Sequence, residues 1–401
     1  MVDHRRLGRE LELFCSDPLA GVGLPIWLPA GAAARLAVEA YVRERERRAG
    51  YQHVLSPPLG KPQLYELSGH ADHFGDEMFP VMRMAPNDEL VLRPSLCPHH
   101  ALVFRSRGRS YRELPMRIAE LGGMYRAERS GVLGGLSRVR AISLDDGHTF
   151  CAPDQVVGEV CRELSLIRRA HTDLGVQVSG FRLSLRGDGG KFVDDPAMWA
   201  RAEAVLREAL AHAGIPYVEA PGEAAFYGPK IDIQVRDGAG RELTLSTVQV
   251  DYGKPHRFEL GYAAADGSRQ VPVMLHRSMV GSMERLFAHL IEVHAGALPV
   301  WYAPVQMEVL PVGDEQVEVA SAFRDAAIAA GLRAELSAGA SLGSRIRRAA
   351  QRKVPYLAVI GRREASAAAV ALRRRDGREH AQMPVPDALR LVAEAAAVPL
   401  A

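Results

Sequence analysis

Residues 122–131 of the chain read GGMYRAERSG, a strand-like run that ends in Arg126 and Glu128. An R-x-E tripeptide is weak by itself, because most single arginines are solvated surface charges. The order of the segments that follow is more specific: R-V-R around Arg138, D-D-x-H ending at His148, and H-R-x(7)-R ending at Arg285. Arginine offers a permanent charge on a planar fork that suits phosphates and carboxylates. This succession of motifs predicts a nucleotide site.

Three residues of the types that bind metals lie far apart in the chain. They are Cys97 in LRPSLCPHH, His148 in SLDDGHTF and His276 in VMLHRSMVGSMERL. One thiolate and two imidazoles would leave the fourth position of a zinc ion open, as in catalytic zinc sites. Spacing alone does not predict such a site, because structural zinc sites use tight Cys pairs. Taken singly, a cysteine is more often a small buried hydrophobe and a histidine a satisfied polar residue.

The bulk composition is that of an ordinary globular protein. The 401 residues are 47% hydrophobic and 24% charged, with a net charge of +2, so only local basic patches are available for nucleic acid. No apolar run reaches the length of a membrane span, and the charged start MVDHRRLGRELELF does not resemble a signal peptide. The 4 cysteines are unevenly spaced and predict no disulfide framework, which indicates a reducing, cytoplasmic location.

Hydrophobic periodicity and turn residues predict two parts. In the first part, residues 1–20 are expected to form a helix that leads into irregular chain. Further helices are expected over residues 31–50, 153–174 and 196–213, and strands over residues 51–58, 89–93, 123–126, 138–143, 230–235, 243–250 and 271–275. Clustered strands with few βαβ units indicate a mixed or antiparallel sheet. Beyond residues 295–303 we expect strands over 305–310, 333–336, 356–360 and 368–373, and helices over 315–330, 342–352 and 386–396. This second part is predicted to be a compact α/β module.

Together, the motifs resemble those of threonyl-tRNA synthetases, a family of class II aminoacyl-tRNA synthetases, over essentially the whole chain. The resemblance implies an α/β (α+β) fold with a class II antiparallel-sheet catalytic core at residues 1–299. An α/β anticodon-binding domain would follow at residues 300–401. The helix at 31–50 with YQHVLSPP behind it has the form of the first class II signature, usually a dimer-interface element. A homodimer is therefore expected, although the segment alone is simply a helix–strand pair.

The resemblance assigns the ATP site and the expected catalytic residues, Arg126, Arg285 and His70. Arg126 would bind the α-phosphate and the substrate carboxylate, where negative charge builds as pyrophosphate leaves. Glu128 would accept a hydrogen bond from the adenine amino group, Arg138 would reach the outer phosphates, and Arg285 would stack on adenine. Mg²⁺ is expected with the ATP. His70, in ELSGHADHF, would assist transfer to the tRNA ribose hydroxyl; the alternative is a surface helix histidine.

By the same resemblance, Cys97, His148 and His276 would hold one zinc ion per chain. In that family the amino group and the side-chain hydroxyl of threonine bind the metal, so valine is rejected. A site that requires a hydroxyl discriminates strongly, whereas an apolar pocket separates isosteres poorly. The resemblance adds the threonine-binding residues: Asp146 as counter-ion of the ammonium, Tyr227, Lys230 and Gln249 on the pocket wall, and Ser282 near the amino acid and adenosine.

Several positions depart from the family pattern. Leu96 and Leu144 stand where amides are usual, and the loop GVLGG at residues 131–135 lacks a histidine. These changes remove hydrogen-bonding capacity but leave the metal-ligand set. We expect activation to be retained while the pocket or its inhibitor sensitivity differs. A specialised or inhibitor-resistant second copy, or one supplying activated threonine to a biosynthetic pathway, would fit this pattern.

Within the last hundred residues positive charge gathers at Arg345, Arg347, Arg348, Arg352, Lys353, Arg362, Arg363 and residues 373–375. This cluster is predicted to face the phosphates of threonine tRNA, although a solvated helix face is the ordinary alternative. The resemblance assigns anticodon reading to Glu364 and Arg373. Residues 339–341, GAS, replace the family's Asn-Glu-Lys, which puts part of that contact in doubt.

Bacterial members of the family usually carry N-terminal extensions with an editing domain that removes serine. The chain begins where the catalytic core begins, so we expect serine activation without internal correction. The leading hypothesis is a threonine–tRNA ligase acting on ATP, L-threonine and threonine tRNA. The first alternative is a paralogue that passes adenylated threonine to a carrier protein or small molecule. The second is a non-catalytic, tRNA-binding regulator, against which the intact arginines and metal-ligand set speak.

Overall fold

The computed structural model of the protein describes residues 2–86, 88–189 and 192–400. These residues form two compact units. The larger unit comprises residues 18–24 and 42–289; the smaller unit comprises residues 2–17, 25–41 and the chain from 290 onward. Within the described residues, no helix has the length and apolar character needed to cross a membrane.

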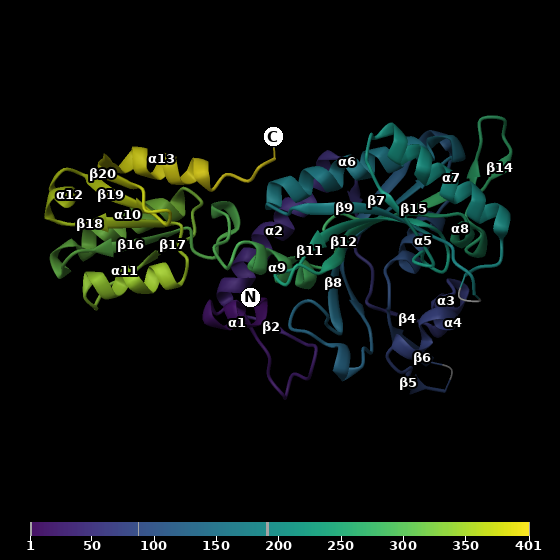
Figure 1. The fold of residues 1–401 in the computed structure, drawn as a ribbon, viewed down its shortest axis with the longest axis horizontal. Helices are drawn as coiled ribbons and strands as arrows, with labels where there is room; N and C mark the ends of the chain where they lie inside the picture. The colour runs from purple at the N-terminus through teal and green to yellow at the C-terminus, as the bar shows by residue number, and fades with distance from the viewer. Residues whose placement is uncertain (1, 87, 190–191, 401) are drawn as a thin grey trace. The chain divides into compact units, whose positions relative to one another are not determined.

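An eight-stranded sheet forms the centre of the larger unit, with the order β10-β9-β11-β12-β15-β8-β7-β3 (Figure 1). Its strands are β3 (Gln52–His53), β7 (Met116–Tyr125), β8 (Ala141–Cys151), β9 (Val178–Leu185), β10 (Val218–Pro221), β11 (Lys230–Arg236), β12 (Glu242–Asp251) and β15 (Val273–Ser278). Neighbours pair antiparallel except at the two edges, where β10 pairs parallel with β9 and β3 with β7. The predicted mixed or antiparallel sheet is therefore confirmed.

Smaller elements complete the larger unit. Its helices are α3 (Pro62–Leu67), α4 (His70–Phe74), α5 (Cys97–Arg105), α6 (Val156–Leu174), α7 (Pro196–His212) and α8 (Gly253–Arg257). Its short strands are β4 (Leu59–Gly60), β5 (Met82–Ala85), β6 (Asp88–Leu92), β13 (Tyr262–Ala263) and β14 (Arg269–Gln270). Helices α2 (Pro29–Arg48) and α9 (Met283–Val293) contribute residues to both units.

Helices α6 and α7 pack on one face of the sheet, where both contact β12. Helix α6 forms because buried apolar residues recur every three or four positions, at Val156, Val160, Leu164 and Ile167. It ends at Gly175, whose φ of 75° is a left-handed conformation that glycine adopts without strain. The helix thus lays one continuous apolar stripe against the sheet.

Strand β12 shows how the sheet separates its two faces. Ser246 points to the α6 face, since its Oγ lies 2.7 Å from Nε2 of His171 on that helix. Side chains alternate along a strand. Thr247, Gln249 and Asp251 therefore point to the opposite face, where they are available to form a site.

A buried arginine ties α2, α6 and the sheet together. Arg277 is 1% exposed, and its guanidinium lies 2.6 Å from Glu46 Oε1 and 2.8 Å from Asp145 Oδ1. Its Nε is 3.5 Å from Oε2 of Glu163 on α6. Buried charges of this kind are tolerated only when they are paired. The sheet therefore carries a fixed polar centre close to the residues of the predicted site.

In the eight-stranded sheet, two predicted strands were misplaced and two strands, β9 and β10, were missed. The predictions at 123–126 and 138–143 correspond to β7 (Met116–Tyr125) and β8 (Ala141–Cys151). Strand β8 carries Asp145, Asp146 and His148 in buried positions, so its polarity hid it from a hydrophobic pattern. Strand β9 (Val178–Leu185) was not predicted, because its exposed first half lacks a continuous apolar run.

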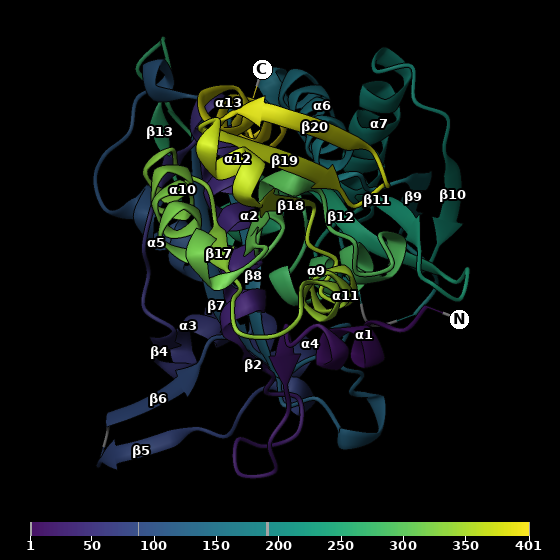
Figure 2. The same cartoon turned by 90° about the vertical axis from the view of Figure 1, so that its left-hand side faces the viewer.

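The smaller unit has a five-stranded sheet of order β17-β16-β18-β19-β20, flanked by helices (Figure 2). Its strands are β16 (Met307–Pro311), β17 (Ala334–Leu336), β18 (Tyr356–Ile360), β19 (Ala369–Arg374) and β20 (Glu379–Pro384). Its helices are α10 (Val317–Ala329), α11 (Leu342–Gln351), α12 (Arg362–Ser366) and α13 (Val385–Ala395). The N-terminal α1 (His4–Glu10), β1 (Phe14–Cys15) and β2 (Ile26–Trp27) belong to the same unit. The predicted order of strands and helices is confirmed, except that α12 and β20 were missed.

Candidate active site

Strand register places four predicted site residues in one row. Lys230 of β11 pairs with Gln249 of β12, Gln249 with His276 of β15, and His276 with His148 of β8. Directly paired residues of antiparallel strands point to the same face. The row lies on the face of the sheet opposite α6. Residues separated by many positions in sequence thus become neighbours.

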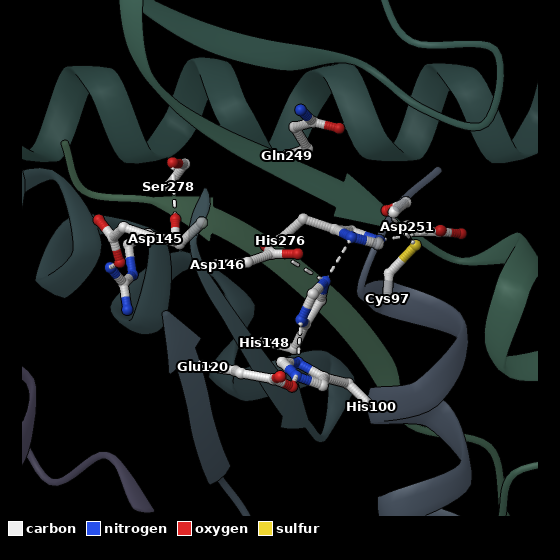
Figure 3. Close-up of polar contacts among 12 residues, drawn as sticks. Cys97, His100, Glu120, Asp145, Asp146, His148, Gln249, Asp251, His276 and Ser278 are labelled. Atoms are coloured by element: carbon white, nitrogen blue, oxygen red, sulfur yellow. Dashed lines mark hydrogen bonds and ion pairs between the residues drawn. The ribbon is translucent and has the colours of Figure 1, made fainter. Parts of the chain in front are cut away.

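Helix α5 brings the third predicted ligand to this row. It begins at Cys97, and the ligand atoms of Cys97, His148 and His276 all lie within 4.8 Å of one another (Figure 3). The three side chains are 2%, 0% and 5% exposed. The structure therefore gathers the thiol and both imidazoles at a single buried point.

A hydrogen bond fixes which nitrogen of His276 faces this point. Its Nε2 lies 3.1 Å from Asp251 Oδ2. Burial would raise the pKa of Asp251, but the charge of Lys254 and the contact with His276 hold it well below its usual value. Because an ionised carboxylate only accepts, Nε2 carries the proton and Nδ1 of His276 keeps its lone pair.

A longer chain of contacts fixes which nitrogen of His148 keeps its lone pair. Glu120 Oε2 lies 3.1 Å from His100 Nε2, and His100 Nδ1 lies 2.6 Å from His148 Nδ1. Burial alone would raise the pKa of Glu120, but hydrogen bonds from His100 and Ser56 and the charge of Arg93 lower it to about 2. The carboxylate therefore accepts from His100 Nε2, and His100 Nδ1 accepts from His148. This leaves the lone pair of His148 on Nε2.

These two tautomers make the site suited to a cation. His148 Nε2 and His276 Nδ1 face each other at 2.8 Å, both as lone pairs. Lone pairs at this distance repel each other, and a cation held by both removes the repulsion. Burial raises the pKa of the Cys97 thiol to about 11, so a bound metal would have to displace its proton. One sulfur and two nitrogens, each imidazole backed by a further acceptor, fit Zn²⁺.

Of the three predicted ligands, His276 lines a pocket on this face of the sheet. It is lined by nine of the predicted site residues: Arg126, Glu128, Arg138, Asp146, Tyr227, Gln249, His276, Ser282 and Arg285. They come from β8, β12, β15, α9 and the loops next to the strands. The structure thus brings the predicted nucleotide and amino-acid residues to one cavity.

Three arginines give part of the pocket a strong positive charge. Arg126 has a buried Nε with no hydrogen-bond partner in the described chain. Arg138 lies 2.8 Å from Oε2 of Glu128, while Arg285 makes only long contacts of 3.4 and 3.5 Å to backbone oxygens. Burial and the charges of Arg126 and Arg138 lower the pKa of Arg285. Cations that repel one another in this way are stabilised by an anionic ligand.

Acidic and aromatic side chains line the part nearer the metal ligands. Asp146 is 7% exposed, and its Oδ1 lies 3.8 Å from His148 Nε2. Burial raises the pKa of Asp146 well above its usual value, and a neighbouring ammonium would favour the charged form. The hydroxyl of Tyr227 donates to Gln249 Oε1, and its ring centroid lies 5.0 Å from that of His276. Tyr227 thus connects the pocket wall to His276, one of the predicted metal ligands.

Four predicted residues of this site lie outside the pocket lining: Cys97 and His148, which adjoin it through His276, and His70 and Lys230. His70 is only 4% exposed, with Nε2 at 3.7 Å from Cys97 Sγ and Nδ1 at 2.7 Å from Ser68 Oγ, so the alternative of a surface histidine is wrong. Lys230 shares the row with Gln249, but its ammonium donates to Asp232. Of the two leucines that replace family amides, Leu144 lines the pocket, whereas Leu96 is fully buried.

Several residues of the smaller unit that were predicted to contact RNA contact other residues of that unit instead. Glu364 Oε2 accepts from the backbone N–H of Gly361 at 2.9 Å, which caps α12, and Arg373 lies 3.5 Å from Glu379. Arg345 is 4% exposed and donates to two backbone oxygens at 2.7 and 2.8 Å. Its predicted exposure to a phosphate backbone is therefore wrong. Its guanidinium instead fixes the loop before α11.

Four residues around the metal ligands were missed: His100, Glu120, Asp251 and Lys254. Two of them had a usable signal. His100 follows Cys97 by three positions, the spacing of one helix face, and Asp251 follows Gln249 by two, the spacing of one strand face. Glu120 pairs with Asp146 across β7 and β8, which only the register reveals.

Comparison with known proteins gives two family matches. Residues 79–294 match the tRNA synthetase class II core domain (G, H, P, S and T), and residues 306–395 match an anticodon binding domain. The threonine–tRNA ligase of Listeria welshimeri is 48% identical over 376 residues, covering 93% of this chain and 59% of that protein. The corresponding protein of Halalkalibacterium halodurans is 46% identical over 398 residues, covering 98% and 62%. The chain thus spans 59–62% of the length of these relatives.

Two solved structures are similar along their whole lengths. One, described as the RNA binding domain of threonyl-tRNA synthetase from Cryptosporidium parvum Iowa II, has a TM-score of 0.93 at 33% identity, covering 99% of each chain. A putative threonyl-tRNA synthetase from Aeropyrum pernix has a TM-score of 0.83 at 26% identity, covering 99% of this chain and 98% of its own.

Proposed function

Because the chain belongs to the threonyl-tRNA synthetase family of class II aminoacyl-tRNA synthetases, we propose that it is an ATP-dependent threonine–tRNA ligase. The family matches confirm the predicted class II core with an anticodon-binding domain behind it. In the proposed reaction the carboxylate of threonine attacks the α-phosphate of ATP, and pyrophosphate leaves. Threonine then passes from the adenylate to the 3′ end of threonine tRNA. We assign the first step to residues 1–299 and recognition of the anticodon to residues 300–401.

One observation carries this proposal. Cys97, His148 and His276 converge beside a pocket that His276 lines together with the cationic side chains of Arg126 and Arg285. The first group suits a metal that recognises an amine and a hydroxyl, and the second suits a nucleotide. A single pocket with both features fits the activation of a β-hydroxy amino acid by ATP.

At the amino-acid end, the proposed roles follow from charge and position. Asp146 would accept from the ammonium of threonine, while Tyr227 and Gln249 would enclose the substrate on the side of β12. Zinc held by the three ligands would act as a Lewis acid toward the amine and the hydroxyl. Lys230 would contribute through Asp232 at the end of the row.

At the nucleotide end, the arginines would stabilise charge that develops in the transition state. Arg126, whose Nε has no partner in the described chain, would hold the α-phosphate and the threonine carboxylate together. Arg138 would bind the outer phosphates with Mg²⁺, and Glu128 would accept from adenine. Arg285 would cover the adenine ring, with Ser282 at the junction of the two substrates.

Transfer to tRNA would use groups outside the pocket lining. His70 is buried beside Cys97, at the metal-ligand end of the site, and we propose that it assists transfer to the ribose hydroxyl. Glu364 and Arg373 would contact the anticodon. We further propose a homodimer, which sedimentation of the purified chain would test, and a changed inhibitor response, because Leu144 gives the pocket wall an apolar side chain.

Threonine-dependent ATP–pyrophosphate exchange, followed by charging of threonine tRNA, tests the proposal. Arg126→Met should lower the exchange rate at least about 100-fold, because one fixed donor to the transition state is lost. Arg129→Met is the matched control, since this exposed neighbour does not line the pocket, and its rate should stay at the wild-type level. Absence of threonine-dependent exchange in the wild-type chain would refute the ligase proposal and favour a regulatory role.

A second candidate function keeps adenylation and changes the acceptor. The observation that favours it is the commitment of Glu364 and Arg345 to contacts within their own unit. In that case the product threonyl-adenylate would be passed to a carrier protein or small molecule. Exchange without charging of threonine tRNA would select this alternative.

A further inference from the structure

A buried lysine lies close to the predicted metal ligands. Lys254 is one of only five lysines in a chain with 50 Lys and Arg residues, and it is 2% exposed. It lies in α8, directly after β12. Lysine is among the residues least often buried, because its ammonium is strongly hydrated. The buried ammonium of Lys254 therefore requires specific partners.

The first partner is the carboxylate that orients His276. Lys254 Nζ lies 3.0 Å from Asp251 Oδ2, and this same oxygen lies 3.1 Å from His276 Nε2. The other oxygen, Oδ1, accepts the backbone N–H groups of Gly253 and Lys254 at 2.8 and 2.9 Å. The lysine and the histidine therefore share one acceptor. The ammonium of Lys254 attracts part of the negative charge of Asp251. Less of that charge then acts on His276, which becomes a weaker electron donor to a metal.

The second partner is the wall of the pocket. Lys254 Nζ lies 3.0 Å from the ring centroid of Tyr227 and 5.3 Å from that of Phe226. The hydroxyl end of Tyr227 is bound to Gln249, so the ring is held at both its edge and its face. A desolvated ammonium over an aromatic face is attracted to it strongly.

The ammonium of Lys254 lies one shared oxygen away from a predicted metal ligand. Asp251 Oδ2 is 3.0 Å from Lys254 Nζ and 3.1 Å from Nε2 of His276. A fixed positive charge at this position repels a divalent cation held by the predicted ligands.

We propose that Lys254 is a positioning residue with two opposed effects: its charge weakens the hold of the site on the metal, and its contact with Tyr227 strengthens the hold of the pocket on threonine. The inference rests on the proposed function. A metal bound less tightly by its protein ligands is the stronger Lewis acid toward the amine and hydroxyl of the substrate. A fixed Tyr227 keeps the facing wall ready for that substrate.

Lys254→Met tests both effects, because methionine keeps the length of the side chain and removes the charge. Zinc affinity, measured by chelator competition on the purified full chain, should rise on the order of tenfold. The KM for threonine in ATP–pyrophosphate exchange should rise on the order of tenfold, with the KM for ATP unchanged. Loss of local structure would weaken both zinc and threonine binding, so opposite directions distinguish the proposed role from damage. Visible absorption of the Co²⁺-substituted chain would report whether the thiolate remains a ligand.

Arg117→Met is the matched control. Arg117 pairs with Glu159 at 2.6 Å and lies one position before Ile118, which shares the row of His148, so its side chain points to the other face of β7. This variant loses a partly buried cation of the same sheet and should keep wild-type zinc affinity. Lys254→Gln, which can still donate to Asp251 but carries no charge, should shift zinc and threonine binding in the same opposite directions as Lys254→Met.

The outcomes separate this inference from the proposed function. Unchanged or weaker zinc binding in both Lys254 variants, beside a wild-type chain that binds zinc, would overturn the role of Lys254 and leave the ligase proposal standing. A wild-type chain that binds neither Zn²⁺ nor Co²⁺ would overturn both. Tighter zinc binding with an unchanged KM for threonine would overturn the part played by Tyr227.

Discussion

At the scale of single residues, hydrogen bonds decide what the predicted ligands can do. Asp251 accepts a hydrogen bond directly from His276, whereas Glu120 acts on His148 through the intervening ring of His100. In both cases a buried carboxylate forces a neutral imidazole to present one particular lone pair. Asp251, Glu120 and His100 orient the lone pairs of the two predicted histidine ligands. These three side chains are therefore as much part of the site as the predicted ligands.

Replacing the thiol should remove the metal. Cys97→Ser leaves a hydroxyl that stays protonated near neutral pH, so zinc affinity should fall at least about 100-fold and threonine-dependent exchange should fall with it. Elemental analysis of purified protein checks the first effect. Cys161→Ser is the control: its Sγ contacts the backbone oxygen of Ala209 at 3.4 Å, between α6 and α7 on the other face of the sheet, and zinc content should not change. Full zinc content in the Cys97 variant would contradict the assigned ligand.

The substrate profile should follow the hydroxyl rather than the size of the amino acid. Serine retains both the amine and the hydroxyl, so its kcat/KM in exchange should lie within about 200-fold of that of threonine. Valine is nearly isosteric with threonine but has no hydroxyl, so its value should be lower by at least about 10⁴-fold. Exchange assays with the three amino acids measure this directly. A pocket that accepts valine better than serine would exclude recognition through the metal.

The sequence predicted which residues line the pocket better than it predicted their contacts. Motif order and the resemblance to threonyl-tRNA synthetases pointed to Arg126, Asp146 and His276, and all three line the pocket. The burial of His70 and the capping role of Glu364 could not be read in this way. Both depend on which atoms of other elements lie nearby in space.

At the scale of elements, β8 and α6 show opposite limits of sequence interpretation. Helix α6 buries an apolar stripe, so its period and its end at Gly175 were visible. Strand β8 buries Asp145, Asp146 and His148 beside Arg277, and a hydrophobic pattern cannot recognise a strand whose buried residues are ionic. Strong polarity in a central strand is a departure from ordinary patterning that functional sites produce.

The contact between α6 and β12 should make the fold sensitive to acid. Burial, then the charge of His289, lowers the pKa of His171 to about 4, while the unfolded chain has the ordinary value of 6.5. Below pH 6.5 His171 is protonated in the unfolded state but stays neutral in the folded state. The contribution of His171 to the free energy of unfolding is therefore complete above pH 6.5 and disappears as the pH falls toward 4. The loss should be about 2 kcal/mol at pH 5.

His171→Gln isolates this effect, since glutamine can still donate to Ser246 Oγ and does not titrate. Urea unfolding at pH 7 and pH 5 gives the difference in unfolding free energy between variant and wild type. The variant should lose less stability on acidification, by about 2 kcal/mol. An equal loss in both proteins would show that His171 does not remain neutral in the folded state.

At the scale of the whole molecule, the fold class and the order of the two parts were predictable. The change from clustered strands to an α/β module near residues 295–303 marks the transition, and the family matches lie on either side of it, at 79–294 and 306–395. The physical division was not predictable, because residues 2–17 and 25–41 pack in the smaller unit despite their N-terminal position. Such long-range packing leaves no signal in local periodicity.

Binding of tRNA should depend on the arginines that have no partner of their own. The side chains of Arg347 and Arg363 are exposed and have no ion pair or hydrogen bond among the described residues. Replacing both with alanine should weaken binding of threonine tRNA and reduce the slope of log K against log salt by about 1 to 2. Filter binding at several salt concentrations measures both quantities.

The control for this prediction is the pair Arg362→Ala and Arg390→Ala. These residues are 82% and 68% exposed but already lie beside Glu315 and Asp387, so their loss should change the salt slope less. Equal effects of the two double variants would mean that general positive charge, rather than the two unpaired arginines, attracts the RNA. Charging by either variant should fall in proportion to its lost affinity.

The row that joins Gln249, His276 and His148 across three strands also limits how the gene can vary in length. Inserting or deleting one codon within β12 would turn Gln249 and Asp251 toward α6 and direct valine side chains at the pocket. The same change in the exposed turn at residues 237–241 would leave every ligand where it is. Insertions and deletions compatible with activity should therefore be confined to the connections, even where substitutions within the strands are tolerated.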